Sequence, residues 1–252
     1  MFLLNCPNPP CQLELEPALK NQAQYLRAAD AWMLSAFVLP LDQFGAAKQL
    51  LTEFDPLHPL HVSALGPKTE NAAAFRDALA KTDTAIRSLS THNVDLVSVR
   101  QLEMFLPPDV DSQLLSETRS ILGSLPTFWE APPDRAEQTI ALVELNSNAD
   151  SPTFGYKLRT SGVTADAFPT SPQITQALVT PATHQVPIKF TAGLHHPLRM
   201  LRDEVKTKMH GFLNVLGAAV LAAEYKWDAR QTALMLEDEN ADSFSFTDEF
   251  FA

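Results

Sequence analysis

The chain has few of the residues that mark secreted or zinc-binding proteins. Only two cysteines, Cys6 and Cys11, occur among 252 residues, and their spacing, without further cysteine or nearby histidine, is not that of a zinc site. We interpret them as reduced thiols of a cytoplasmic protein rather than as a local disulfide. Residues 1–6 lack a basic region, and their apolar part is too short for a secretory signal peptide, so none is expected.

The sequence also lacks long apolar runs and an excess of positive charge. No run approaches the roughly 20 apolar residues that span a bilayer, so we expect no membrane-spanning segment. The net charge of −11 opposes binding to nucleic acids and to anionic membranes, because both repel an acidic protein. Hydrophobic residues make up 45% and charged residues 19% of the chain, which is typical of a folded soluble domain. Length and composition favour a single domain over residues 1–252 and do not predict the oligomeric state.

Hydrophobic periodicity predicts strands that alternate with helices. A helix at about 13–31 precedes the first strand. The predicted strands are 33–39, 60–65, 94–105, 126–130, 154–159 and 186–191, and the helices between them are 42–54, 70–89, 107–122, 132–145 and 172–179. Helices at 210–225 and 228–239 follow, and 244–251 is a candidate seventh strand.

This alternation predicts an α/β fold with a mainly parallel sheet and right-handed crossovers. Six or seven βα units fall short of the eight in a regular (β/α) barrel. We therefore expect a TIM-like (β/α) barrel that is incomplete or distorted, with an open parallel α/β sheet as the alternative. No glycine-rich dinucleotide motif or Walker loop follows a strand, which disfavours the nucleotide-binding open folds.

Most residues suited to chemistry lie between 154 and 214. Glycine is scarce, at eight residues in the chain, yet five glycines lie at 155–217. Alternation along a strand places Lys157 with Arg159 on one face, and Lys189 with Thr191 on one face of the next strand. Both rows are expected to point into the barrel. If the strands are neighbours, the lysines lie together and their mutual repulsion favours a neutral amine, which imine chemistry needs.

A cation cluster of this kind also suits a phosphate or carboxylate. The structural alternative is that the two lysines pair with Glu130, Glu103 or Asp95 in a buried network. Glu130 ends a strand and is a candidate general base or metal ligand.

A second group of candidates follows the last two strands of the barrel. Thr160 and Ser161 are placed to hold an anion through a turn. The other candidates for substrate or anion binding are His195, His196, His210 and Asn214. Between them a basic loop, which contains Arg199, Arg202, Lys206 and Lys208, is a candidate lid. Glu130, His195, His196 and His210 form an alternative divalent-metal site, although their spacing matches no standard zinc motif.

Two resemblances rest on these residues. The run VPIKFTAGLHHPLR, followed by HGFLN, resembles a family of uncharacterised bacterial proteins. The pair YKLRTSG and IKFTAG is similar to the two lysine motifs of deoxyribose-phosphate aldolase, K-T-S-T-G and K-x-S-G-G, on a (β/α) barrel. The resemblance implies that Lys157 forms the Schiff base, that Lys189 activates it, and that Asp95 in VDLV is the catalytic aspartate. Leu158 and Arg159 depart from the first motif.

The sequence thus predicts an enzyme that acts on a small anionic carbonyl metabolite, phosphorylated or carboxylated, through aldolase-like Schiff-base lyase chemistry. One alternative is a hydrolase or isomerase that uses a divalent metal ion. The other is a barrel that binds a metabolite without turnover.

Overall fold

The computed structural model describes residues 13–91, 93–147, 154–162, 164–245 and 247. Cys6 and Cys11 lie outside these residues. The chain divides into two compact units: the described residues up to Trp129 belong to unit 1, and those from Glu130 onward belong to unit 2. No helix in the described part of the chain has the length and apolar character needed to cross a membrane.

The strands form a six-stranded sheet in which neighbours in the chain are neighbours in the sheet, in the order β1 to β6. Pairing is parallel between β1 and β2, between β2 and β3, and between β5 and β6. The strands are β1 (Phe37–Pro40), β2 (Leu60–Leu65), β3 (Val97–Phe105), β4 (Thr127–Glu130), β5 (Phe154–Arg159) and β6 (Ile188–Thr191). A separate antiparallel hairpin consists of β7 (Met200–Arg202) and β8 (Thr207–Met209).

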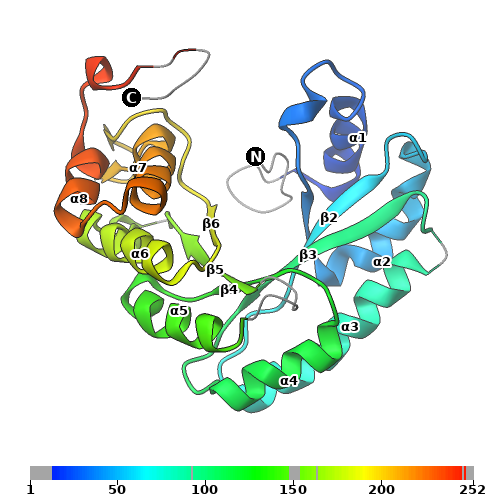
Figure 1. The fold of residues 1–252 in the computed structure, drawn as a ribbon. Coiled ribbons are helices and arrows are strands. Elements are labelled where there is room, and N and C mark those ends of the chain that lie inside the picture. The colour runs from blue at the N-terminus through cyan, green and yellow to red at the C-terminus, as the bar shows by residue number, and fades with distance from the viewer. Residues whose placement is uncertain (1–12, 92, 148–153, 163, 246, 248–252) are drawn as a thin grey trace. The chain divides into compact units, whose positions relative to one another are not determined.

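Each of the six strands is followed by a helix before the next begins (Figure 1). The helices are α1 (Leu15–Tyr25), α2 (Phe44–Ala47), α3 (Ala72–Ser90), α4 (Ser112–Leu122), α5 (Ala136–Leu145), α6 (Ser171–His184), α7 (Phe212–Tyr225) and α8 (Ala229–Glu237). Sequential strand order with a helix after every strand is the topology of a TIM-like barrel. With six βα units among the described residues in place of eight, the barrel is incomplete, and the predicted fold class is confirmed.

Side-chain caps and aromatic packing explain where the elements of unit 1 begin and what they bury. The Asn71 side chain accepts a hydrogen bond from the backbone N–H of Ala74 at the start of α3. At the start of α4, the Asp111 side chain accepts one from the backbone N–H of Leu114. Phe75 of α3 packs against Trp129 of β4, with ring centroids 5.6 Å apart. Both side chains are fully buried, so this contact attaches α3 to the sheet through a large apolar area.

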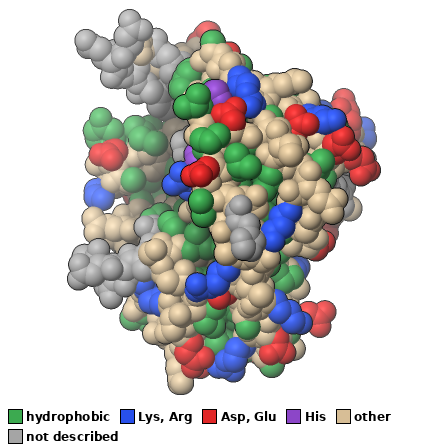
Figure 2. Space-filling view, turned by 90° about the vertical axis from the view of Figure 1, so that its right-hand side faces the viewer, with side chains coloured by type: hydrophobic (Ala, Val, Ile, Leu, Met, Phe, Trp, Pro, Cys, Tyr) green, Lys and Arg blue, Asp and Glu red, His purple; other side chains and the backbone are tan. Residues whose placement is uncertain are grey.

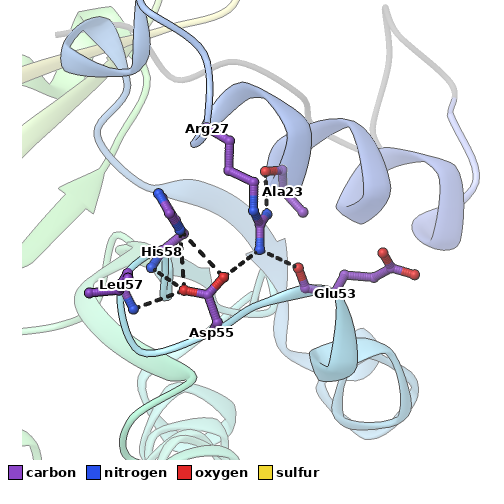
Figure 3. Close-up of polar contacts among 6 residues, drawn as sticks. All are labelled: Ala23, Arg27, Glu53, Asp55, Leu57 and His58. Carbon is purple, nitrogen blue, oxygen red and sulfur yellow. Dashed lines mark hydrogen bonds and ion pairs between the residues drawn. The ribbon is translucent and has the colours of Figure 1, made fainter.

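A polar cluster attaches the end of α1 to the loop that precedes β2 (Figure 3). Arg27 donates to the Ala23 and Glu53 carbonyls and to Asp55, the last at 2.7 Å. Asp55 also accepts the backbone N–H groups of Leu57 and His58. Partial burial acts to raise the pKa of Asp55, but the hydrogen bonds from Arg27, His58 and Leu57 outweigh it and lower that pKa. The cluster therefore stabilises a turn at the amino end of β2.

Helix α6 shows why one predicted boundary was wrong. A capping box between Thr170 and Gln173 starts the helix, and Pro172 lies in its first turn, where the missing N–H costs nothing. The predicted end was residue 179, yet the helix continues through Pro181 to His184. It ends at Gln185, which adopts the left-handed conformation. The proline is buried, so packing outweighs the lost backbone hydrogen bond.

Three other predicted elements differ from the structure. Helix α1 covers Leu15–Tyr25 rather than 13–31, and a 3₁₀ turn at Ala31–Met33 delays the first strand to Phe37. The basic loop after β6 contains the β7–β8 hairpin. Of the proposed strand 244–251, the described residues 244, 245 and 247 have no strand pairing, and the others lie outside the described residues.

On one face of the molecule, charges of the two signs are mixed rather than gathered by sign. On the face that Figure 2 shows, acidic and basic side chains are interspersed with hydrophobic ones. The net charge of −11 therefore produces no single acidic patch on that face.

Candidate functional site

The two lysines of unit 2 lie side by side on adjacent strands. In the parallel pairing of β5 with β6, Lys157 is in register with Lys189 and Arg159 is in register with Thr191. Adjacent strands are about 4.8 Å apart, and residues in register point to the same face of a sheet. The predicted neighbouring rows are therefore confirmed, and they place two ammonium-bearing side chains on one face of unit 2.

Lys157 is the most deeply buried cation of this pair. Its side chain is 4% exposed, and its Nζ atom lies 2.6 Å from Oε2 of Glu130. On the opposite face of β5, Tyr156 and Leu158 are fully buried. A charge in such surroundings requires a partner of opposite sign, and Glu130 supplies it. The pairing with Glu130 is one of the arrangements that the sequence indicated.

Glu130 is held at the carboxyl end of β4, where it keeps some contact with solvent. Its side chain is 22% exposed. The hydroxyl of the buried Tyr156 donates to the Ala131 carbonyl at 3.2 Å, which fixes the backbone next to Glu130. Burial, reinforced by the charges of Glu130 and Asp134, raises the pKa of Tyr156, so the phenol stays neutral and remains a donor. No pattern in the sequence indicates this contact.

The loops after β5 and β6 are packed closely together. The Thr160 N–H donates to the Thr191 carbonyl at 2.9 Å, and the Thr160 hydroxyl donates to the carbonyls of Thr191 and Ala192. Gly193 has φ of +83°, and a Cβ there would lie 2.8 Å from the Thr160 carbonyl oxygen and 2.4 Å from Cβ of Ser161. Only glycine fits this position. The Thr160 hydroxyl proton and N–H are both donated to backbone carbonyls, and the predicted role of this turn in anion binding stays a prediction.

Arg159 supports its own loop. The guanidinium Nε donates to the Ser161 carbonyl at 2.9 Å, and the side chain is exposed. Arg159 is the last residue of β5 and so lies at the carboxyl end of the strand, the edge at which barrel enzymes place their sites. Arg159, Ser161 and Thr191 therefore lie beside the lysine pair, and their predicted role in anion binding stays a prediction.

The two consecutive histidines have different surroundings. His195 is exposed, whereas His196 is half-buried and its Nε2 contacts a guanidinium nitrogen of Arg202. Arg202 in turn pairs with Glu204 at 2.9 Å. Partial burial, with the charges of His196 and Arg202, lowers the pKa of His195. The neutral form of the His195 imidazole is therefore favoured.

His210 has a structural role. It is 4% exposed, and its Nε2–H donates to the Pro169 carbonyl at 3.2 Å, which links the start of α7 to the loop before α6. Burial lowers the pKa of His210, and the nearby charge of Arg199 acts in the same direction. A buried neutral imidazole whose Nε2–H is already donated is poorly placed to bind an anion, and the predicted binding role of His210 stays a prediction.

Asn214 is also structural. Its side chain is fully buried. The amide oxygen accepts the Arg199 backbone N–H at 2.8 Å, and the amide nitrogen donates to the carbonyls of Met235 and Asp238 at 2.7 and 2.8 Å. Both amide protons are used, and the predicted contact of Asn214 with substrate stays a prediction. Asn214 connects the hairpin to the end of α8.

The alternative metal site is not assembled. Among the described residues, which include Glu130, His195, His196 and His210, no three His, Cys, Asp or Glu side chains form a group able to hold a metal ion. His210 donates to a carbonyl and His196 contacts a guanidinium group. The donor set that the sequence indicated is therefore not brought together within the described residues.

Two acidic candidates lie in unit 1. Asp95 is exposed in the turn before β3, which begins at Val97, so its predicted place within the strand was wrong. Glu103, near the carboxyl end of β3, is 1% exposed. Its Oε1 accepts the Ser63 hydroxyl at 2.5 Å, and Gln101 donates to the same hydroxyl at 2.8 Å. The sequence analysis missed this network, although the period-two spacing of Gln101 and Glu103 indicated a shared polar face.

The basic hairpin is neutralised by acidic residues. Glu239 lies 2.8 Å from Arg199 and 2.5 Å from Lys208. Hydrogen bonds from Lys208 and Arg199 lower the pKa of Glu239. These ion pairs hold the hairpin in place, so it is poorly suited to move as a lid. They also leave Arg199 and Lys208 paired with a protein carboxylate. The acidic run after residue 236 was the available signal for this pairing.

The chain matches no protein-family model and no curated protein sequence. The resemblances to the bacterial family and to the aldolase therefore rest on their short motifs. What the geometry offers chemically is an amine and a carboxylate in contact, with a second amine alongside.

Proposed function

We propose that unit 2 carries a lysine-based site for a small anionic carbonyl compound, and that the protein is an imine-forming lyase of the cytoplasm. The observation that supports this proposal is the buried Lys157–Glu130 pair, 2.6 Å apart, beside Lys189 in register. The pair joins a nucleophile to a proton acceptor, while Lys189 and Arg159 supply positive charge for a phosphate or carboxylate.

The proposed reaction begins with proton transfer from Lys157 to Glu130. The neutral amine nitrogen then adds to the carbonyl carbon and gives a carbinolamine. Two of the three original ammonium protons leave with the carbonyl oxygen as water, with Glu130 carrying protons between nitrogen and oxygen. The third proton stays on the iminium nitrogen, which then accepts the electron pair of a carbon–carbon bond as that bond breaks.

A second candidate function is binding without turnover. The short contact between Lys157 and Glu130 favours it, because a carboxylate in contact stabilises the ammonium form, which is not nucleophilic. In this case Lys189 and Arg159 retain an anion and Lys157 remains structural.

Borohydride trapping separates the two functions. The protein is incubated with glyceraldehyde 3-phosphate or pyruvate and reduced with borohydride, and the modified peptide is identified by mass spectrometry. A stable adduct on Lys157 is the expected result, and Lys20→Met, on an exposed lysine of unit 1, is the matched control that leaves it unchanged. Thermal stabilisation by either compound without an adduct supports binding alone. If neither an adduct nor thermal stabilisation were observed, both functions would be rejected.

A further inference from the structure

A cavity of about 720 Å³ lies in unit 1, apart from the residues of the lysine site. It is lined by the loops that follow β1 and β2 and by one face of α3. Alanines on that face, Ala74, Ala78 and Ala85, leave the space open because their side chains are short. Sites for small molecules occupy about 300–1,000 Å³ and are mainly apolar with a few polar groups, which this cavity matches.

Three charged side chains line the cavity, and they have both signs. Asp42 follows β1, whereas Asp77 and Lys81 lie one turn apart on α3. None of the three forms a hydrogen bond or ion pair with another residue in the described part of the chain. Their charges are therefore available to a ligand that carries an ammonium group and a carboxylate.

A buried hydroxyl supplies a further polar group. Thr69 lines the cavity and is 9% exposed, and its Oγ1 has no hydrogen-bond partner among the described residues. Buried hydroxyls in proteins nearly always have a partner, so this one requires a ligand or solvent molecule. The neighbouring Thr82, by contrast, donates to the Ala78 carbonyl at 2.8 Å.

The remaining walls are apolar and select the body of the ligand. Pro40 and Leu41 line one side of the cavity, and Leu65 and Pro67 line another. An apolar side chain that enters this space loses its contact with water, which favours binding by about 25 cal/mol for each Å² buried. The ligand therefore combines an apolar body with a zwitterionic head.

We propose that the cavity binds an amino acid with a large apolar side chain. Asp42 and Asp77 receive the ammonium group, Lys81 receives the carboxylate, and the apolar side chain lies along the alanine face of α3. The proposal does not depend on the lysine site in unit 2.

Calorimetry of the full-length protein with three matched probes tests the proposal. L-phenylalanine carries both charges, 2-phenylethylamine lacks the carboxylate, and 3-phenylpropanoate lacks the amine. L-Phenylalanine is expected to bind at least about tenfold more tightly than either of the others, because each of them leaves one charged partner unused. Absence of phenylalanine binding, or equal binding of all three, would overturn the proposal.

Variants on α3 locate the site. Ala85→Leu fills the cavity from a half-buried position and is expected to weaken phenylalanine binding at least about tenfold. Ala80→Leu changes an exposed position that does not line the cavity, so phenylalanine binding is expected to be unchanged. Asp77→Asn and Lys81→Gln change charge at exposed positions, so folding is retained while binding falls. Phenylalanine binding that is insensitive to Ala85→Leu and Asp77→Asn would place it elsewhere and reject the site.

Discussion

At the scale of single residues, the Lys157–Glu130 pair shows how one contact serves both folding and chemistry. Lys157 is nearly fully buried, whereas Glu130 keeps 22% of its side chain exposed. Solvent thus reaches the carboxylate side of the pair, where a substrate would enter and where a proton can be exchanged. The apolar neighbours of Lys157 make the carboxylate necessary for folding even without a ligand.

A double-mutant cycle measures this coupling. Glu130→Gln leaves the buried ammonium without its counter-charge, and we expect it to lower the free energy of unfolding by about 3 kcal/mol, the low end for a broken buried pair. Lys157→Met removes the buried charge, so the double variant Lys157→Met/Glu130→Gln should recover most of that loss in urea denaturation. If the two effects simply added, the contact would not be an energetic pair.

At the scale of elements, His210 links α7 to the loop before α6, and its burial makes that link depend on pH. The pKa of His210 is lowered in the folded protein by burial, whereas an exposed histidine has a value near 6.5. Below pH 6.5 the unfolded chain therefore binds a proton that the folded chain does not. The contribution of neutral His210 to the free energy of unfolding is therefore fully present above pH 6.5. It is lost as the pH falls toward the pKa of His210 in the folded protein.

Thermal unfolding measured between pH 7.5 and 5 checks the effect. We expect the melting temperature to fall with pH in this window and His210→Gln to flatten the dependence, because glutamine retains a donor for the Pro169 carbonyl but does not titrate. His184→Gln, on a more exposed histidine whose side chain is 38% exposed and pairs with Glu144, is the control. A slope unchanged by His210→Gln would show that other groups cause it.

The elements also show how much of the structure the sequence predicts. Strand β2 was predicted at its observed bounds, and Pro59 and the Gly66–Pro67 pair enclose its short, mostly apolar run. The hairpin was missed because β7 and β8 are three residues each and rich in charge. The roles of His210 and Asn214 were missed for another reason: their partners are carbonyls up to 41 residues away, and any residue type supplies a carbonyl.

At the scale of the whole molecule, the boundary between the two units falls inside β4, between Trp129 and Glu130. A domain boundary normally falls in an exposed linker. Cutting the chain here would divide a four-residue strand and separate Trp129, which packs on Phe75, from Glu130, which pairs with Lys157. The units are therefore expected to fold together as the single domain that the sequence predicts.

Urea unfolding followed at two tryptophans tests this cooperativity. Trp129 is fully buried and reports on unit 1, and Trp227 is half-buried and reports on unit 2. The variants Trp32→Phe/Trp227→Phe and Trp32→Phe/Trp129→Phe each leave one reporter, and the exposed Trp32 is removed from both at little cost. Coincident fluorescence midpoints, equal to the midpoint of each variant's circular dichroism, are expected for one cooperative transition. Separate midpoints within one variant would instead establish two domains, each with its own stability.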